Sequence, residues 1–215
     1  MSRIVDLSFP LEDGQLNFPL DPKISVSVFH SVAKIGYNLA QLSLSTHQGT
    51  HVDAPYHFFA DGRTIDLVDL NRFYGRAALI DFAPNRYLAP QTLLTVEMFQ
   101  AHEALFEPGA RIIYRTGWDR MFGKPEYFTH FPTMTMEASR WIASREISLL
   151  GMDTPTPSSD WLECHQILLA RGTEIVIVEG LTRLELLPSR FTFIGFPLNI
   201  KGQDGSPIRA VGILE

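Results

Sequence analysis

The stretch Ser45-Thr-His-Gln-Gly-Thr-His-Val-Asp-Ala-Pro-Tyr-His57 brings together three of the chain's seven histidines and one aspartate. His47 and His51 have the four-residue spacing that would place them on one face of a helix. Gly49 and Pro55 argue against a helix, because both residue types are unfavourable in helix interiors. The stretch is therefore expected to be extended chain.

The residues before this stretch favour the same interpretation. Residues 39–45 alternate between apolar and polar side chains, which is typical of a half-buried strand. If the alternation continues, His47, His51 and Asp53 project to one side of the chain. The same phase includes His57, although a proline precedes it and can interrupt the strand. Four candidate ligands in one phase favour a metal or catalytic site over isolated structural histidines.

These side chains have the chemistry of a metal site. Two imidazoles and a carboxylate form a donor set that suits Zn²⁺, Mn²⁺ or Fe²⁺. Three protein ligands leave a coordination position for water, and the metal lowers the pKa of that water towards neutrality. A histidine that does not bind the metal can transfer protons, because imidazole has an unperturbed pKa of about 6.5. His57 is the candidate for that role.

The rest of the chain is typical of a mixed α/β fold in a single domain over residues 1–215. Short runs rich in β-branched or aromatic residues are expected to be strands, and segments with helical spacing of apolar residues are expected to be helices. Thr135 is a plausible N-cap for one helix, and Gly172 a plausible stop for another. The expected strands are residues 4–7, 24–29, 39–45, 77–82, 111–115, 149–152, 175–179 and 191–196, and the expected helices are residues 92–105, 136–145 and 162–171.

Composition narrows the classes of partner. The 215 residues are 45% hydrophobic and 20% charged, which is enough apolar surface for a sizeable core. A formal net charge of -6 argues against general binding to nucleic acid or to an anionic membrane. The single cysteine, Cys164, excludes an intrachain disulfide. The sequence has no signal-peptide pattern and no apolar run long enough to span a membrane, so a cytoplasmic protein is expected.

The pattern His-x-Gly-Thr-His-x-Asp-x-Pro-x-His over residues 47–57 resembles the signature of the cyclase-type metal-dependent amidohydrolases, which include bacterial kynurenine formamidases and isatin hydrolases. The resemblance continues through residues 5–11, 114–118, 131–132, 151–154 and 165–181, and so covers most of the chain. It implies a β/β/α swivelling-type domain in which helices flank a mixed sheet or barrel-like core. It also implies a homodimer or a larger homo-oligomer.

The resemblance further implies roles for individual residues. The enzyme would hydrolyse a small amide, formamide, or cyclic amide or ester, with N-formylkynurenine as the first candidate substrate. It would use one or two divalent ions, zinc or manganese. The implied metal ligands are His47, His51, Asp53, His165 and Glu179, with Asp53 as a bridge between two ions, and His57 is the implied acid–base residue.

Two departures from the family pattern leave parts of this assignment open. The separation of His165 and Glu179 is longer than in formamidase-like members, so Glu163 or Glu174 could replace Glu179, or a second metal could be absent. Residues 17–22 lack the family's Pro-Gly-Asp turn near the substrate, which raises isatin-like lactams and lactones as further possible substrates. A lyase or cyclase reaction, or a metal-binding protein without catalytic activity, would also be compatible with these residues. Cys164 is expected to be a buried structural thiol rather than a nucleophile.

Overall fold

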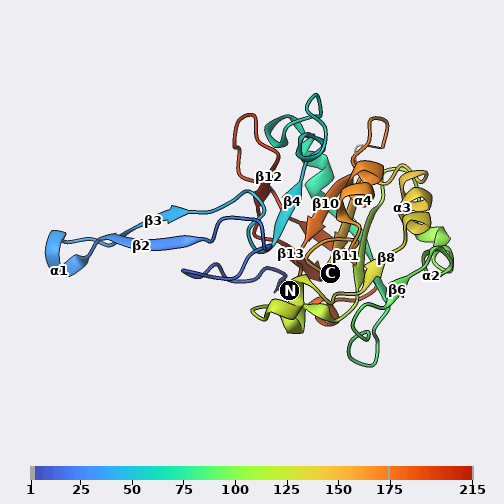
Figure 1. The fold of residues 1–215 in the computed structure, drawn as a ribbon, viewed down its shortest axis with the longest axis horizontal. Helices are drawn as coiled ribbons and strands as arrows, with labels where there is room; N and C mark the ends of the chain where they lie inside the picture. Colours follow the sequence, from blue (N-terminus) through green and yellow to red (C-terminus); the bar gives the residue numbers. More distant parts are fainter. Residues whose placement is uncertain (1–2, 174, 215) are drawn as a thin grey trace.

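The computed structural model describes residues 3–173 and 175–214, and over these residues nine strands form one mixed sheet at the centre of the fold (Figure 1). Their order across the sheet is β1-β13-β11-β5-β7-β9-β10-β4-β12. The strands are β1 (Arg3–Asp6), β4 (His51–Asp53), β5 (Tyr74–Asp81), β7 (Arg111–Arg115), β9 (Leu149–Met152), β10 (Val176–Glu179), β11 (Arg190–Ile194), β12 (Gly205–Pro207) and β13 (Val211–Leu214).

The middle of the sheet consists of four parallel strands, β5, β7, β9 and β10. Both β9 and β10 are buried along their whole length, as their almost uninterrupted apolar sequences require. One face of the sheet packs against α2 (Val96–Gln100), α3 (Met136–Ala143) and α4 (Trp161–Leu168). The other face curls around a second apolar core, to which the antiparallel strands on both sides of the parallel group contribute. The prediction of a mixed α/β fold with a curled, barrel-like sheet is confirmed.

The expected helix over residues 92–105 is wrong for residues 92–95, and after α2 (Val96–Gln100) it is interrupted before a 3-10 turn over residues 103–105. Residues 93–94 form a short strand, β6 (Leu93–Leu94), which pairs in parallel with β8 (Thr133–Met134). The backbone hydrogen bonds of this pair hold the chain extended, so tertiary pairing overrides helical periodicity. The Thr135 cap is present, since its side chain accepts a hydrogen bond from the amide of Ala138.

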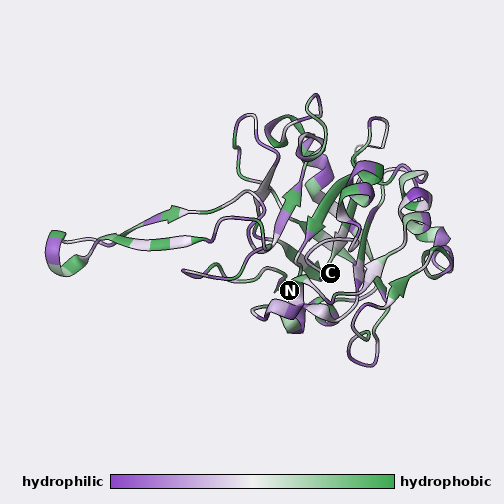
Figure 2. Cartoon of the chain, in the orientation of Figure 1, coloured by the Kyte–Doolittle hydropathy of each residue, from purple (hydrophilic) through white to green (hydrophobic). Residues whose placement is uncertain are grey.

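The largest departure from expectation is an arm that projects from the body of the molecule (Figure 1). It is made of β2 (Ser25–His30) and β3 (Leu39–Ser43), an antiparallel pair joined through the short helix α1 (Val32–Ile35). Every residue of β3 is exposed, so the half-buried strand expected over residues 39–45 is wrong in its burial. Figure 2 shows hydrophobic residues along the arm, and these apolar side chains have no core beneath them.

No helix of the described structure has the length and apolar character needed to cross a membrane. Over the same described residues, seven short 3-10 turns connect the longer elements. These turns are η1 (Pro55–His57), η2 (Ile65–Leu67), η3 (Leu70–Phe73), η4 (Glu103–Leu105), η5 (Trp118–Met121), η6 (Pro125–Phe128) and η7 (Leu184–Leu186).

Candidate metal centre

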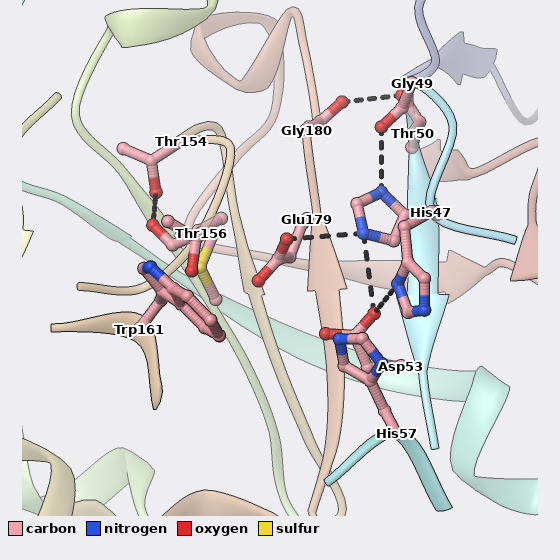
Figure 3. Close-up of polar contacts among 12 residues, drawn as sticks. His47, Gly49, Thr50, Asp53, His57, Thr154, Thr156, Trp161, Glu179 and Gly180 are labelled. Carbon is pink, nitrogen blue, oxygen red and sulfur yellow. Dashed lines mark hydrogen bonds and ion pairs between the residues drawn. The ribbon is translucent and has the colours of Figure 1, made fainter. Parts of the chain in front are cut away.

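The centre of the site is the short buried strand β4, which lies between β10 and β12 in the sheet. In the antiparallel pairing with β10, His51 lies opposite Glu179 and Asp53 lies opposite Ile177. His51 Nε2 is 3.3 Å from Glu179 Oε2 and 3.4 Å from Asp53 Oδ1. The register of the sheet therefore places the His51 imidazole between the carboxylates of Asp53 and Glu179. Figure 3 labels these two carboxylates.

His47 reaches the same place by a different route from the one expected. The chain between β3 and β4 is not a continuous strand, because residues 46–47 form a turn and Gly49 adopts a left-handed conformation with φ of +63°. The turn carries His47 back over β4, so that its Nδ1 lies 2.7 Å from Asp53 Oδ1. The extended-chain interpretation holds for His51 and Asp53 on β4 and is wrong for His47, but the side chains that it grouped do converge.

His165 and Glu179 also meet at this centre, in spite of the 14 residues that separate them in sequence. His165 Nε2, on α4, is 3.2 Å from Glu179 Oε1 and 3.2 Å from Asp53 Oδ2. Glu163, considered above as a replacement for Glu179, lies on the same helix but makes a half-exposed ion pair with Arg140. Glu174, the second possible replacement, lies outside the described residues.

In His47, His51 and His165, the ring nitrogen that points away from Asp53 and Glu179 contacts a hydrogen-bond acceptor. His51 Nδ1 is 2.9 Å from the Gly49 carbonyl, and His165 Nδ1 is 2.7 Å from the Trp161 carbonyl. These acceptors require the outer nitrogen to carry a proton, so the inner nitrogen, which faces the carboxylates, is the one that would release its proton to bind a metal. Metal-binding histidines in proteins are typically oriented in this way.

His47 is oriented in the same way, but its acceptor is the side chain of Asp204 rather than a backbone carbonyl. His47 Nε2 is 2.8 Å from Asp204 Oδ2. Two candidate ligand groups result, His47 with Asp53 and His57, and His51 with Asp53 and Glu179, and the ligand atoms within each group lie within 4.8 Å of one another.

The electrostatics of the cluster favour a cation. Burial disfavours the charged form of His47, but Asp53 and Asp204 outweigh this and raise the pKa of His47 to about 10. Burial likewise opposes charge on His165, but Asp53 and Glu179 raise its pKa to about 10. Asp53 is 1% exposed, and its Oδ2 finds no hydrogen-bond donor of suitable geometry among the described residues. The donor set and this buried oxygen without a hydrogen bond fit a divalent ion.

His57 lies at the edge of this cluster, in the 3-10 turn η1 that follows β4. Its ring stacks on the His47 ring, with 3.9 Å between centroids and 28° between planes. His57 Nδ1 is 3.2 Å from Asp204 Oδ2. Asp204 was missed in the sequence, because an isolated aspartate followed by a glycine is typical of a surface turn. Burial raises its pKa, but hydrogen bonds from His47 and His57 outweigh that effect and hold the pKa well below its usual range.

A cavity of about 180 Å³ opens onto the cluster, and its lining includes His47, His51, His57, His165 and Glu179. Aromatic rings form the opposite wall. Phe18 contacts Phe128 and Trp161 edge-on, Trp161 contacts Phe58, and the Phe58 ring stacks on His165 with 4.6 Å between centroids.

Cys164, adjacent to His165 in sequence, does not reach this cavity. It is fully buried in the apolar core beneath the helices, and burial raises the pKa of its thiol well above the ordinary value. A buried, protonated thiol is a poor nucleophile.

Comparisons with known proteins show the family to which the chain belongs. The family model described as "Putative cyclase" matches residues 5–159. The chain is 30% identical to a kynurenine formamidase of Bacillus cereus, over 98% of this chain and 97% of that protein. It is 34% identical to a kynurenine formamidase of Salinibacter ruber, over 81% of this chain and 79% of that protein.

Solved structures have the same fold. Isatin hydrolase A from Ralstonia solanacearum superposes with a TM-score of 0.85 at 26% identity, covering 100% of this chain and 92% of that one. The chain belongs to the cyclase family of metal-dependent amidohydrolases.

Proposed function

We propose that this enzyme cleaves the C–N bond of a small aromatic amide, with arylformamides such as N-formylkynurenine as the first candidates. The observation that carries the proposal is the aromatic wall that runs from Phe128 through Phe18, Trp161 and Phe58 to His165. A ring held against this wall has its amide beside the carboxylates and histidines. A cavity of about 180 Å³ has room for one ring, since an engineered apolar cavity of about 150 Å³ binds benzene.

In this proposal the ion is held by side chains from three parts of the fold. Asp53, nearly inaccessible to solvent, offers one oxygen towards His47 and His51 and the other towards His165. Asp53 would therefore be shared between the ligands on both sides of the cluster. The proposed ligands are His47, His51, Asp53, His165 and Glu179.

A divalent ion bound there would polarise the scissile carbonyl and acidify a water molecule. The aromatic wall orients the substrate ring and excludes water from that side of the cavity. His57 lines the cavity and is proposed to move the proton to the leaving nitrogen. With Nδ1 donating to Asp204, the neutral His57 ring presents an unprotonated Nε2 that can accept a proton.

Zinc and manganese are both proposed as the native ion. Nitrogen and oxygen ligands without a thiolate suit either metal. Two ions at full loading are proposed, because Asp53 has one oxygen beside His47 and His51 and the other beside His165.

A lactam of the isatin type is the second candidate substrate. The part of the cavity lining contributed by residues 16–21 supplies apolar side chains, Asn17 and Asp21, and the lining as a whole has no lysine or arginine among the described residues. A compact neutral lactam needs no cationic partner, whereas the carboxylate of an amino acid is commonly bound by one.

The test uses purified enzyme, metal analysis and a substrate panel. The panel is N-formylkynurenine, formanilide, isatin, an aliphatic formamide of similar polarity and a simple lactone. We expect kcat/KM for an aromatic amide or lactam to exceed that for the aliphatic formamide at least tenfold, with ¹⁸O from labelled water in the product. A product without ¹⁸O would indicate a lyase or cyclase. A metal-loaded protein that turns over none of the panel would contradict the proposal.

We also propose a homodimer in which the arm contacts a second copy of this chain. A lone two-stranded ribbon is marginally stable in water, yet Val28 is 79% exposed and Leu42 is 58% exposed. The arm carries Lys34 and no acidic residue, in a chain whose formal net charge is -6, so its charge complements the acidic remainder. In a two-fold dimer each arm would lie on the other copy.

A further inference from the structure

We propose that Asp204 is a positioning residue that fixes the orientation of both the metal-ligand candidate His47 and the acid–base candidate His57. The inference rests on the proposed function, because it assigns a task within that site. No sequence motif pointed to Asp204. It enters the site from the loop before β12, far along the chain from both histidines.

One carboxylate oxygen serves both rings. Asp204 Oδ2 lies 2.8 Å from His47 Nε2 and 3.2 Å from His57 Nδ1. The other oxygen, Oδ1, accepts a hydrogen bond of 2.9 Å from the hydroxyl of Thr46. With both oxygens engaged, the carboxylate has one orientation, and the two rings that it contacts are held stacked on each other.

The backbone of Asp204 is fixed as firmly as its side chain. Its carbonyl accepts a hydrogen bond of 2.9 Å from the Ala54 amide, directly after β4. The next residue, Gly205, pairs with Asp53 across the β4–β12 ladder. The sheet that positions Asp53 therefore also positions Asp204.

The carboxylate determines which nitrogen of each ring carries hydrogen. An ionised aspartate only accepts hydrogen bonds, so His47 Nε2 and His57 Nδ1 must both be donors. Nδ1 of His47, 2.7 Å from Asp53 Oδ1, is then the nitrogen that would lose its proton and bind an ion. The lone pair of neutral His57 lies on Nε2, available for proton transfer.

Asp204 differs from the equivalent partners of His51 and His165. Those two histidines donate to backbone carbonyls, which no substitution removes. Among the described residues that orient the cluster in this way, Asp204 alone can be tested by changing a side chain. Residues in this position typically affect metal affinity or activity by 10–100-fold when they are changed.

The test compares Asp204→Asn with a matched control, Asp66→Asn. Asp66 anchors the same loop, because its Oδ1 accepts hydrogen bonds from the Gly202 amide and the Thr64 hydroxyl, but it touches neither histidine. Three quantities are measured in each variant. They are Mn²⁺ affinity by calorimetry, kcat and KM on the best substrate of the panel, and the histidine tautomers of the Zn²⁺-loaded protein by ¹⁵N–¹H spectroscopy.

We expect Asp204→Asn to weaken Mn²⁺ binding and lower kcat, each by roughly 10–100-fold, with KM within about threefold of wild type. His57 should lose its Nδ1–H tautomer. Asp66→Asn should match wild type in all three measurements. Mn²⁺ affinity and tautomers in Asp204→Asn equal to those of Asp66→Asn would overturn the inference.

A second variant covers the case in which Asp204→Asn does not fold. Thr46→Val removes only the donor to Asp204 Oδ1 and should shift Mn²⁺ affinity and kcat several-fold in the same direction. Wild-type values in Thr46→Val, with Asp204→Asn insoluble, would also overturn the inference. The affinity and tautomer measurements do not require turnover, so they decide the role of Asp204 even if the wild-type enzyme hydrolyses none of the proposed amides.

Discussion

Gly205 lies opposite Asp53 in the β4–β12 pairing, and a Cβ added to Gly205 would come within 2.9 Å of Cε1 of the His47 ring. The same Cβ would be 2.7 Å from the carbonyl oxygen of Val52. The glycine is therefore the surface on which the His47 ring rests.

Gly205→Ala is expected to displace that ring. The added methyl group should destabilise the fold by about 1–3 kcal/mol, because it is too close to the Val52 carbonyl and to the His47 ring. It should also weaken Mn²⁺ binding, because relieving the clash moves His47, a proposed ligand. Gly195→Ala is the control, since its Cβ would press on Phe193 and Ile208, away from the metal cluster. Chemical denaturation and calorimetry measure the two effects. Equal Mn²⁺ affinities in the two variants would show that Gly205 does not support His47.

His51→Ala and His57→Ala should separate metal binding from proton transfer. His51 Nε2 faces two carboxylates, so its loss is expected to empty the site of metal and abolish hydrolysis. His57→Ala should retain the metal and lower kcat by roughly 10²–10⁴-fold, the usual contribution of general acid–base catalysis. Metal content after dialysis and steady-state kinetics distinguish the two. If His57→Ala emptied the site, His57 would be a ligand rather than the acid–base residue.

The metal-free protein should lose stability as the pH rises. The pKa values of His47 and His165 are raised from 6.5 to about 10 in the folded state, so folding retains protons that the unfolded chain releases. Their stabilising contribution is fully present below about pH 6.5 and is lost as the pH rises through about 10. We therefore expect the Tm of the chelated protein to fall across this interval, and the gain in Tm on adding Zn²⁺ to grow, because the ion replaces those protons.

The control for this pH dependence is chelated His165→Gln, which should give a shallower fall in Tm. A Tm for the chelated wild type that is flat or rising between pH 7 and 9 would contradict the assigned proton binding. Scanning calorimetry over that range makes the measurement.

The exposed face of the arm should control oligomeric state. Val28 and Leu42 lie on the same face of the ribbon, because Val28 pairs with Ala40 and Leu42 pairs with Val26. The double variant Val28→Glu, Leu42→Glu is expected to convert a dimer into a monomer in light scattering, because it places charges on the face that a second copy would bury. Leu67→Glu with Leu70→Glu is the control, since both leucines are exposed on the body. A dimer that survives the arm substitutions would exclude this face as the interface.

The sequence predicted the parallel strands well, because strands buried on both faces have continuous apolar runs bounded by turn residues. It failed where a longer-range partner determined the outcome. The alternation in residues 39–45 has the period of a half-buried strand, but its neighbour is only β2, and no core lies beneath it. At the start of the helix expected over residues 92–105, the pairing of β6 with β8 holds the chain extended, and the helix begins only at Val96.

The candidate site divides in the same way. His47, His51 and Asp53 are close together in sequence, and their residue types alone suggested a metal. His165 and Glu179 required resemblance to a family, because they come from a helix and a strand that only the fold brings together. Asp204 could be recognised only from its contacts with His47 and His57 in the structure, since neither spacing nor composition distinguishes it from other loop aspartates.

The position of β4 between β10 and β12 has a consequence for biosynthesis. Residues 51–53 pair with residues 177–179 on one side and 205–207 on the other. A ribosome must therefore extrude almost the whole of this sequence before the early histidines meet their later partners. A nascent or truncated chain that ends before β10 lacks the carboxylate opposite His51, so we expect the proposed ligand set to be completed only after β10 has emerged.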